Sequence, residues 1–98
     1  MQSCNTLHIE KGTPACLKSK ISTFNISSSC ADAEVKEFTF QGTVVYVFEP
    51  GTCGADMMSE VVKSDCTNLG FLGGITGNTT INGENFSDAT FVRIVWRK

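Results

Sequence analysis

The spacing of apolar side chains changes along the chain, from a helical period near the amino terminus to a strand period further on. Leu17, Ile21 and Phe24 recur at i, i+4 and i+7, which places them on one helical face. Thr13 can cap a helix with its hydroxyl, and Pro14 suits the first helical turn. The pattern predicts a helix of about three turns that begins at Thr13.

An alternating pattern follows and predicts a β-hairpin. Residues 38–40 alternate aromatic and polar side chains, and residues 43–48 are all β-branched or aromatic. Gln41 and Gly42 lie between the two runs, where glycine can adopt positive φ. A smaller hairpin is predicted over residues 79–86, around Asn82-Gly83.

Three further strands are predicted, over residues 57–63, 69–72 and 89–96. The last of them has apolar side chains on both faces, which predicts a central position or cover on both sides. Together the elements predict an α+β fold in which one amino-terminal helix packs on an antiparallel sheet of about four strands. Residues 1–12 show no periodicity and are interpreted as a tether, and residues 13–98 as a single globular domain.

Charge and apolar run length exclude two classes of function. The chain has eight basic and ten acidic residues, and the basic ones are scattered. Such a balance does not neutralise a run of phosphates, so nucleic-acid binding is excluded. The longest apolar run is Val44 to Phe48, far short of the roughly 20 residues that cross a bilayer as a helix.

Five cysteines in 98 residues predict an exported domain held by two disulfides, with one sulfur to spare. Cys16, Cys30, Cys53 and Cys66 allow three pairings, and their grouping favours Cys16 with Cys30 and Cys53 with Cys66. Each ring would span about 15 residues and contribute roughly 3 kcal/mol in the chain-entropy model. Structural zinc is disfavoured because no two cysteines have the C-x-x-C spacing.

Cys4 is the spare sulfur. Met1-Gln2-Ser3-Cys4 has the form of a start residue placed on the end of a bacterial lipobox, where a small residue precedes the cysteine that is acylated. Cys4 would then be the lipidation site and the mature amino terminus. The alternative is a free thiol in a flexible arm.

No catalytic or metal-binding constellation stands out. The one histidine, His8, lies in the expected tether, and the acidic residues follow no spacing that selects a pair. Asn78 to Gly83 matches the opening of a calcium loop, but position twelve is Ala89 instead of glutamate, which favours a hairpin tip. Weak calcium binding by Asp56, Glu84 or Asp88 remains open. We expect a non-enzymatic, monomeric protein without a cofactor.

Residues 70–83 hold five of the nine glycines, and a glycine-bearing loop in a small domain often serves recognition. The predicted contact region combines Asp56 with Gly73, Gly74, Thr76, Gly77 and Asn78. The alternative is that these glycines only allow the backbone to turn beneath the sheet.

The stretch from Phe38 to Trp96 resembles a family of small exported proteins and lipoproteins of Bacteroidota that has only a domain-of-unknown-function label. The resemblance rests on Phe40-Gln41-Gly42, on Val45 to Phe48, on Cys53 with Asp56, on Leu69 to Asn78, and on Val95-Trp96. It implies export and an envelope location, and it supplies no activity.

The sequence therefore predicts a periplasmic or lipid-anchored domain that binds a protein or another envelope component and touches the membrane only through Cys4. The alternative is a small secreted protease inhibitor, because a bridged domain with a rigid exposed loop can occupy a protease cleft without changing shape.

Overall fold

One helix and one five-stranded sheet form the main body of the fold. The computed structural model describes residues 8–54 and 57–98. The elements in chain order are α1 (Ala15–Ser27), β1 (Glu34–Phe40), β2 (Thr43–Glu49), β3 (Met58–Lys63), β4 (Asn68–Gly73), β5 (Thr80–Ile81), β6 (Glu84–Asn85), the 3₁₀ helix η1 (Phe86–Asp88) and β7 (Thr90–Arg97). The antiparallel sheet has the order β4-β3-β2-β1-β7, and β5 pairs with β6 alone. The α+β prediction agrees with this fold, although the sheet has five strands where about four were expected.

Both predicted hairpins are confirmed, and both turn through two residues with positive φ. Gln41 (φ 52°) and Gly42 (φ 74°) join β1 to β2, and Asn82 (φ 54°) and Gly83 (φ 78°) join β5 to β6. Positive φ at both central residues defines the type I′ turn, whose twist matches that of the flanking strands. The predicted strands at residues 57–63 and 69–72 are also present, as β3 and β4.

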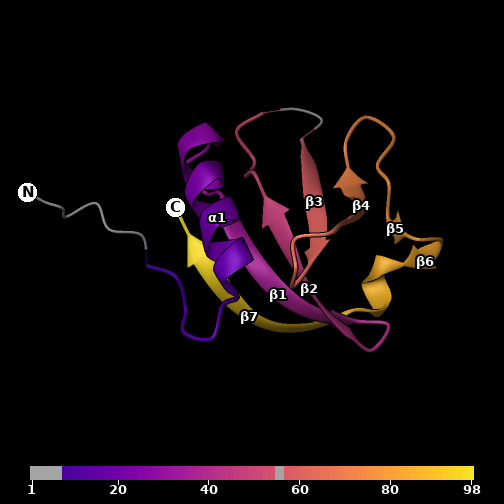
Figure 1. Cartoon of the computed structure of the whole chain (residues 1–98). Helices are drawn as coiled ribbons and strands as arrows, with labels where there is room; N and C mark the ends of the chain where they lie inside the picture. Colours follow the sequence, from indigo (N-terminus) through magenta and orange to yellow (C-terminus); the bar gives the residue numbers. More distant parts are fainter. Residues whose placement is uncertain (1–7, 55–56) are drawn as a thin grey trace, which may run out of the picture.

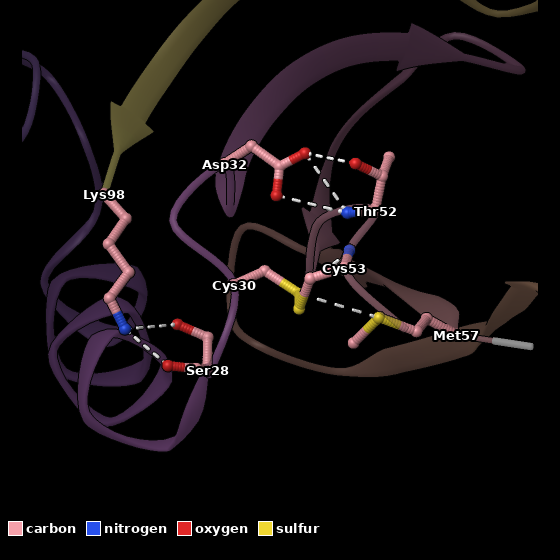
Figure 2. The surroundings of a disulfide bond; sticks show 7 residues. All are labelled: Ser28, Cys30, Asp32, Thr52, Cys53, Met57 and Lys98. Atoms are coloured by element: carbon pink, nitrogen blue, oxygen red, sulfur yellow. Dashed lines mark hydrogen bonds between the residues drawn. A yellow bond between two sulfur atoms is a disulfide. The ribbon is translucent and has the colours of Figure 1, made fainter. Parts of the chain in front are cut away.

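α1 lies across one face of the sheet (Figure 1) and begins later than predicted. Pro14 occupies the N-cap position, and the helix has no side-chain cap there. Thr13, the predicted cap, donates its hydroxyl to the carbonyl of Glu10 (2.6 Å) and so closes the turn before the helix. At the other end, the ammonium of Lys98 binds the carbonyl oxygen of Ser28 (Figure 2). A cation at this end complements the helix dipole.

The core has two parts because successive residues of β2 point to opposite faces of the sheet. Tyr46 and Phe48 face α1 and pack with Leu17 and Ile21. On the other face a second cluster lies beneath the β5–β6 hairpin: Phe40, Val45, Val47, Val61 and Ile81. The predicted apolar face of the helix is therefore confirmed, and the sheet also has an apolar patch that α1 does not cover.

The prediction that the last strand is central or covered on both sides is wrong. β7 lies at the edge of the sheet, beside β1, and Phe91 and Val92 are 51% and 47% exposed. Its register against β1 shifts twice, at Val92 and at Val95, which is the signature of β-bulges. A bulge turns neighbouring side chains toward one face, so Val95 and Trp96 are both buried on the α1 side. Simple alternation therefore misassigned this strand.

Residues 8–12 belong to the predicted tether, but in the structure they lie along β7. The amide of Glu10 donates to the carbonyl of Val95 (3.0 Å), and Ile9 packs against the core beneath α1. The guanidinium of Arg93 donates to the carbonyl of Lys11 (3.0 Å). Cys4, the predicted lipidation site, lies outside the described residues.

The predicted local pairing of the cysteines is wrong. The structure joins Cys16 to Cys66 and Cys30 to Cys53, with Cα atoms 6.1 and 5.5 Å apart. α1 crosses the sheet, so its first turn lies over the β3–β4 turn, which carries Cys66. The segment after α1 carries Cys30, which lies beside Cys53 in the segment that follows β2. The two bridges therefore join residues that are 50 and 23 positions apart in the sequence and that the fold brings together.

Candidate functional site

The face of the sheet opposite α1 carries an open groove. The β5–β6 hairpin and η1 cover only one end of this face, above Phe40 and Val45. Beside them the same face has a hollow of about 600 Å³, which we call the sheet groove. Its apolar lining comes from β1, β2, β4, η1 and the residue after η1, and comprises Phe38, Val47, Leu72, Phe86 and Ala89. Its polar lining comprises Glu49, Ser59, Asn78, Thr79, Asn85 and Ser87.

Aromatic rings form one wall of the sheet groove. Phe38 contacts Phe86 and Phe91 edge to face, with ring centroids 5.2 and 5.6 Å apart. The ring centroid of Phe40 lies 4.9 Å from that of Phe86, at the end of the face that the β5–β6 hairpin covers. The η1 turn that carries Phe86 is fixed, because the Phe86 amide donates to the carbonyl of Thr79 (2.9 Å). The groove therefore has a rigid, apolar wall.

The other end of the sheet groove is acidic. Glu49 and Ser59 also border a second hollow of about 240 Å³, which Asp32, Glu34 and Thr52 line as well. The ammonium of Lys36 lies 3.2 Å from Glu49 and 3.4 Å from Glu34. Burial alone would lower the pKa of Lys36, but the charges and hydrogen bonds of Glu49 and Glu34 outweigh it and raise the pKa.

Asp32 is held as a carboxylate at this acidic end. The hydroxyl of Thr52 donates to Asp32 Oδ2 (2.6 Å), and the Thr52 amide lies 3.1 Å from Oδ1, as Figure 2 shows. The hydroxyl hydrogen bond, followed by the amide hydrogen bond, lowers the pKa of Asp32 below its ordinary value. Gly51 makes this arrangement possible, because a Cβ at that position would collide with Asp32 and Cys30.

The predicted glycine-rich contact loop is a closed turn beyond β4. The backbones of Gly73 and Asn78 exchange two hydrogen bonds (2.8 and 3.1 Å). Asn78 also donates its side-chain amide to the carbonyls of Phe71 (2.6 Å) and Thr80 (2.8 Å), so it ties β4 to β5. Gly73 and Gly77 both have positive φ, 83° and 63°, which explains why glycine occurs there.

Asn78 lines the sheet groove, and the turn displays Ile75, 86% exposed, at its tip. Gly74 packs beside the Met58 side chain, and Thr76 is exposed. Asp56, the other predicted contact, lies outside the described residues. The structure therefore brings one of the predicted contact residues, Asn78, to the groove.

One feature of the sequence, the apolar run of β2, indicates that a second face of the sheet needs cover. The run from residue 43 to 48 is apolar or β-branched at nearly every position, so both faces of that strand need cover. A single predicted helix covers one face. The second face therefore needed a second layer, and the β5–β6 hairpin with η1 supplies one that leaves a hollow beside it.

Within residues 8–54 and 57–98, no group of three or more His, Cys, Asp or Glu side chains is arranged to hold a metal ion. In the same residues, no helix has the length and apolar character needed to cross a membrane.

A family model described as "Domain of unknown function (DUF6970)" matches residues 22–98. The matched part contains the second half of α1 and all the strands. No curated protein and no solved structure matches the chain.

Proposed function

The chain belongs to the DUF6970 family of unknown function, and we propose that it is an exported, non-enzymatic binding domain of the cell envelope. In this proposal the sheet groove is the binding site. The partner is a protein or another envelope component, and Cys4 provides a lipid anchor.

The observation that carries the proposal is the apolar hollow on the face of the sheet that α1 does not cover. A soluble domain normally buries both apolar faces of a sheet, and α1 covers one of them here. The hollow on the other face, about 600 Å³, falls within the roughly 300–1,000 Å³ typical of ligand pockets. Phe38 and Leu72 contribute apolar surface at its floor, and polar groups surround it. An apolar floor with a polar rim is typical of recognition sites.

A binding role fits the groove better than catalysis because the carboxylate that lines it, Glu49, is already held by the ammonium of Lys36. The imidazole of His8 pairs with Glu10 (3.1 Å) beside β7, away from the sheet groove. General acid–base catalysis needs a titratable group that can reach a substrate proton.

Export is supported by the two disulfides, which favour an oxidising compartment. The proposed anchor is tested by Cys4→Ser in the full-length precursor. The variant should leave the membrane fraction for the soluble periplasmic fraction, and unchanged fractionation would reject the anchor.

The binding site is tested with a neutral apolar dye, N-phenyl-1-naphthylamine, titrated into the protein while dye fluorescence is recorded. We expect saturable binding at one site. Leu72→Gln should weaken it about tenfold, because a contact with one aliphatic side chain contributes on the order of 1.5 kcal/mol or more. The matched control is Phe71→Gln, since Phe71 is the next residue of β4 and lies on the opposite face. Absence of saturable binding, or equal loss in both variants, would overturn the proposal.

A second candidate function, protease inhibition, is favoured by one observation. Ile75 is 86% exposed at the tip of a turn that the Gly73–Asn78 hydrogen bonds hold closed, and a rigid exposed side chain suits a protease specificity pocket. Under this proposal the protein inhibits a protease that prefers aliphatic side chains, and Ile75→Asp abolishes the effect. If no protease in a broad panel is inhibited at micromolar concentration, the candidate is rejected.

A further inference from the structure

The sheet groove and the acidic hollow form one continuous surface. Glu49 and Ser59 line both of them. Val47 and Glu49 are two positions apart on β2, so they lie on the same face of the sheet. The surface therefore runs along the strand direction from an apolar end, where the partly exposed Phe38 and Leu72 flank the buried Val47, to an acidic end at Glu49 and Asp32.

The spacing of these two ends matches an extended peptide. Side chains at i and i+2 of a strand are roughly 6.6–6.8 Å apart, since each residue advances about 3.3–3.4 Å. This holds for Val47 and Glu49, and it holds equally for a peptide lying extended along β2. An apolar side chain over Val47 would therefore place the side chain two positions further on at Glu49.

The charges of the acidic end favour a cation at that second position. Three carboxylates gather there, from Asp32, Glu34 and Glu49. Lys36 bridges Glu34 and Glu49, and Arg97, whose side chain is 68% exposed, reaches Glu34 from the rim. Asp32 has no basic partner among the described residues. Thr52 fixes its orientation, so this anion is already positioned for a charged ligand.

The rim of the groove offers hydrogen-bonding groups to a peptide backbone. Ser59 lies on one side, and Thr79 and Asn85 lie on the side of the β5–β6 hairpin. Hydroxyl and amide side chains both donate and accept, as a peptide backbone requires.

We infer that the sheet groove binds an extended peptide segment that carries an aromatic or long aliphatic side chain and, two positions further on, lysine or arginine. The apolar side chain fills the hollow between Val47 and Phe86. The basic side chain pairs with Asp32 and Glu49. This inference rests on the proposed function, because it names the ligand of the same groove.

The inference is tested with synthetic peptides by isothermal titration calorimetry at low ionic strength. The first peptide is acetyl-Ser-Phe-Ser-Lys-Ser-amide, and two others replace its Lys by Glu or its Phe by Ser. We expect the Phe/Lys peptide to bind about five- to tenfold more tightly than either, and its affinity to fall as salt is raised. A peptide with Phe and Lys adjacent should bind as weakly as the Phe/Glu peptide, because its Lys points away from the acidic end.

Asp32→Asn should weaken the Phe/Lys peptide several-fold and leave binding of N-phenyl-1-naphthylamine unchanged. The matched control is Asp65→Asn. Asp65 is held in the same way, by hydrogen bonds from Thr67, but it lies in the β3–β4 turn, away from both hollows. Equal binding of the Lys and Glu peptides would overturn the inference. If the dye binds and the peptides do not, the peptide inference fails and the proposed groove stands, and if the dye also fails to bind, both fail.

Discussion

Removing the Cys16–Cys66 bridge should lower the free energy of unfolding by more than removal of a local bridge between Cys16 and Cys30 would. The perturbation is the double substitution Cys16→Ala with Cys66→Ala, which leaves the Cys30–Cys53 bridge in place. In the chain-entropy model, the bridge over 50 positions would by itself restrict the unfolded chain by about 4 kcal/mol, and the bridge over 23 positions by about 3.5 kcal/mol. The retained Cys30–Cys53 bridge lies inside the larger ring and shortens it to the stretches 16–30 and 53–66, so the expected loss is about 3.5 kcal/mol.

Urea unfolding followed by Trp96 fluorescence measures the loss, since the one tryptophan is 2% exposed in the folded protein. The free energy of unfolding should fall by about 3.5 kcal/mol, a large part of the 5–15 kcal/mol typical of such domains. The Cys30→Ala, Cys53→Ala variant is the matched comparison and should lose slightly less. A loss below about 1 kcal/mol in the first variant would contradict this entropic reasoning.

Peptide mapping tests the pairing itself. Trypsin cleaves after Lys and Arg, which places the four cysteines in four different peptides: residues 12–18, 21–36, 37–63 and 64–93. Unreduced protein should yield 12–18 joined to 64–93 and 21–36 joined to 37–63. Recovery of 12–18 joined to 21–36 would refute the arrangement of α1 over the β3–β4 turn.

Three further predictions concern stability. Ile21→Ala should lower the free energy of unfolding by about 2–5 kcal/mol, because Ile21 is fully buried on the face of α1 that packs against the sheet; calorimetry checks this, and a loss below about 1 kcal/mol would contradict the packing. Gly51→Ala should destabilise by about 2 kcal/mol or more, because Gly51 has φ 108° and no room for a Cβ; a neutral effect in the same urea assay would contradict the crowding at Asp32 and Cys30. Hydrogen bonds from Thr52 hold the pKa of Asp32 below 3.8, so ionised Asp32 stabilises the fold above about pH 4 and this contribution is lost as the pH falls below that value. Asp32→Asn should therefore be less stable than the parent at pH 7 and should approach it in acid, and a difference independent of pH would be evidence against the Thr52 contact.

The local elements could be predicted because their signals lie within a few residues. The β1–β2 hairpin follows from alternation on each side of Gln41-Gly42, and the buried face of α1 follows from the spacing of Leu17 and Ile21. The start of α1 could not be predicted from residue type. Thr13 forms its hydrogen bond to Glu10 instead of capping the helix, and the local pattern fits both arrangements.

The arrangement of these elements depends on contacts between distant residues. β7 pairs with β1, so Phe38 lies opposite Phe91, and two bulges then bury Val95 beside Trp96. The alternation of side chains within one strand predicts neither which strands pair nor where a bulge interrupts the pairing. The disulfide pairing is subject to the same limit, because Cys16 meets Cys66 only after α1 has packed across the sheet.

The candidate site was predicted only where it touches the glycine-rich turn. Asn78 lies at the groove, but most of the lining comes from strand residues such as Phe38, Val47 and Leu72. In the sequence these residues look like core. Whether an apolar strand residue is covered depends on the size of the second layer. Here that layer is a hairpin of two short strands and a single turn of 3₁₀ helix.

The sheet groove is tested most directly by NMR of methyl-labelled protein titrated with the Phe/Lys peptide. The methyl resonances of Val47, Leu72 and Ala89 should shift in proportion to bound peptide. Those of Ile21, on the buried face of α1, and of Ile75, at the tip of the Gly73–Asn78 turn, should stay in place. Shifts confined to Ile75, or to methyl groups on the α1 side of the sheet, would contradict binding in the groove.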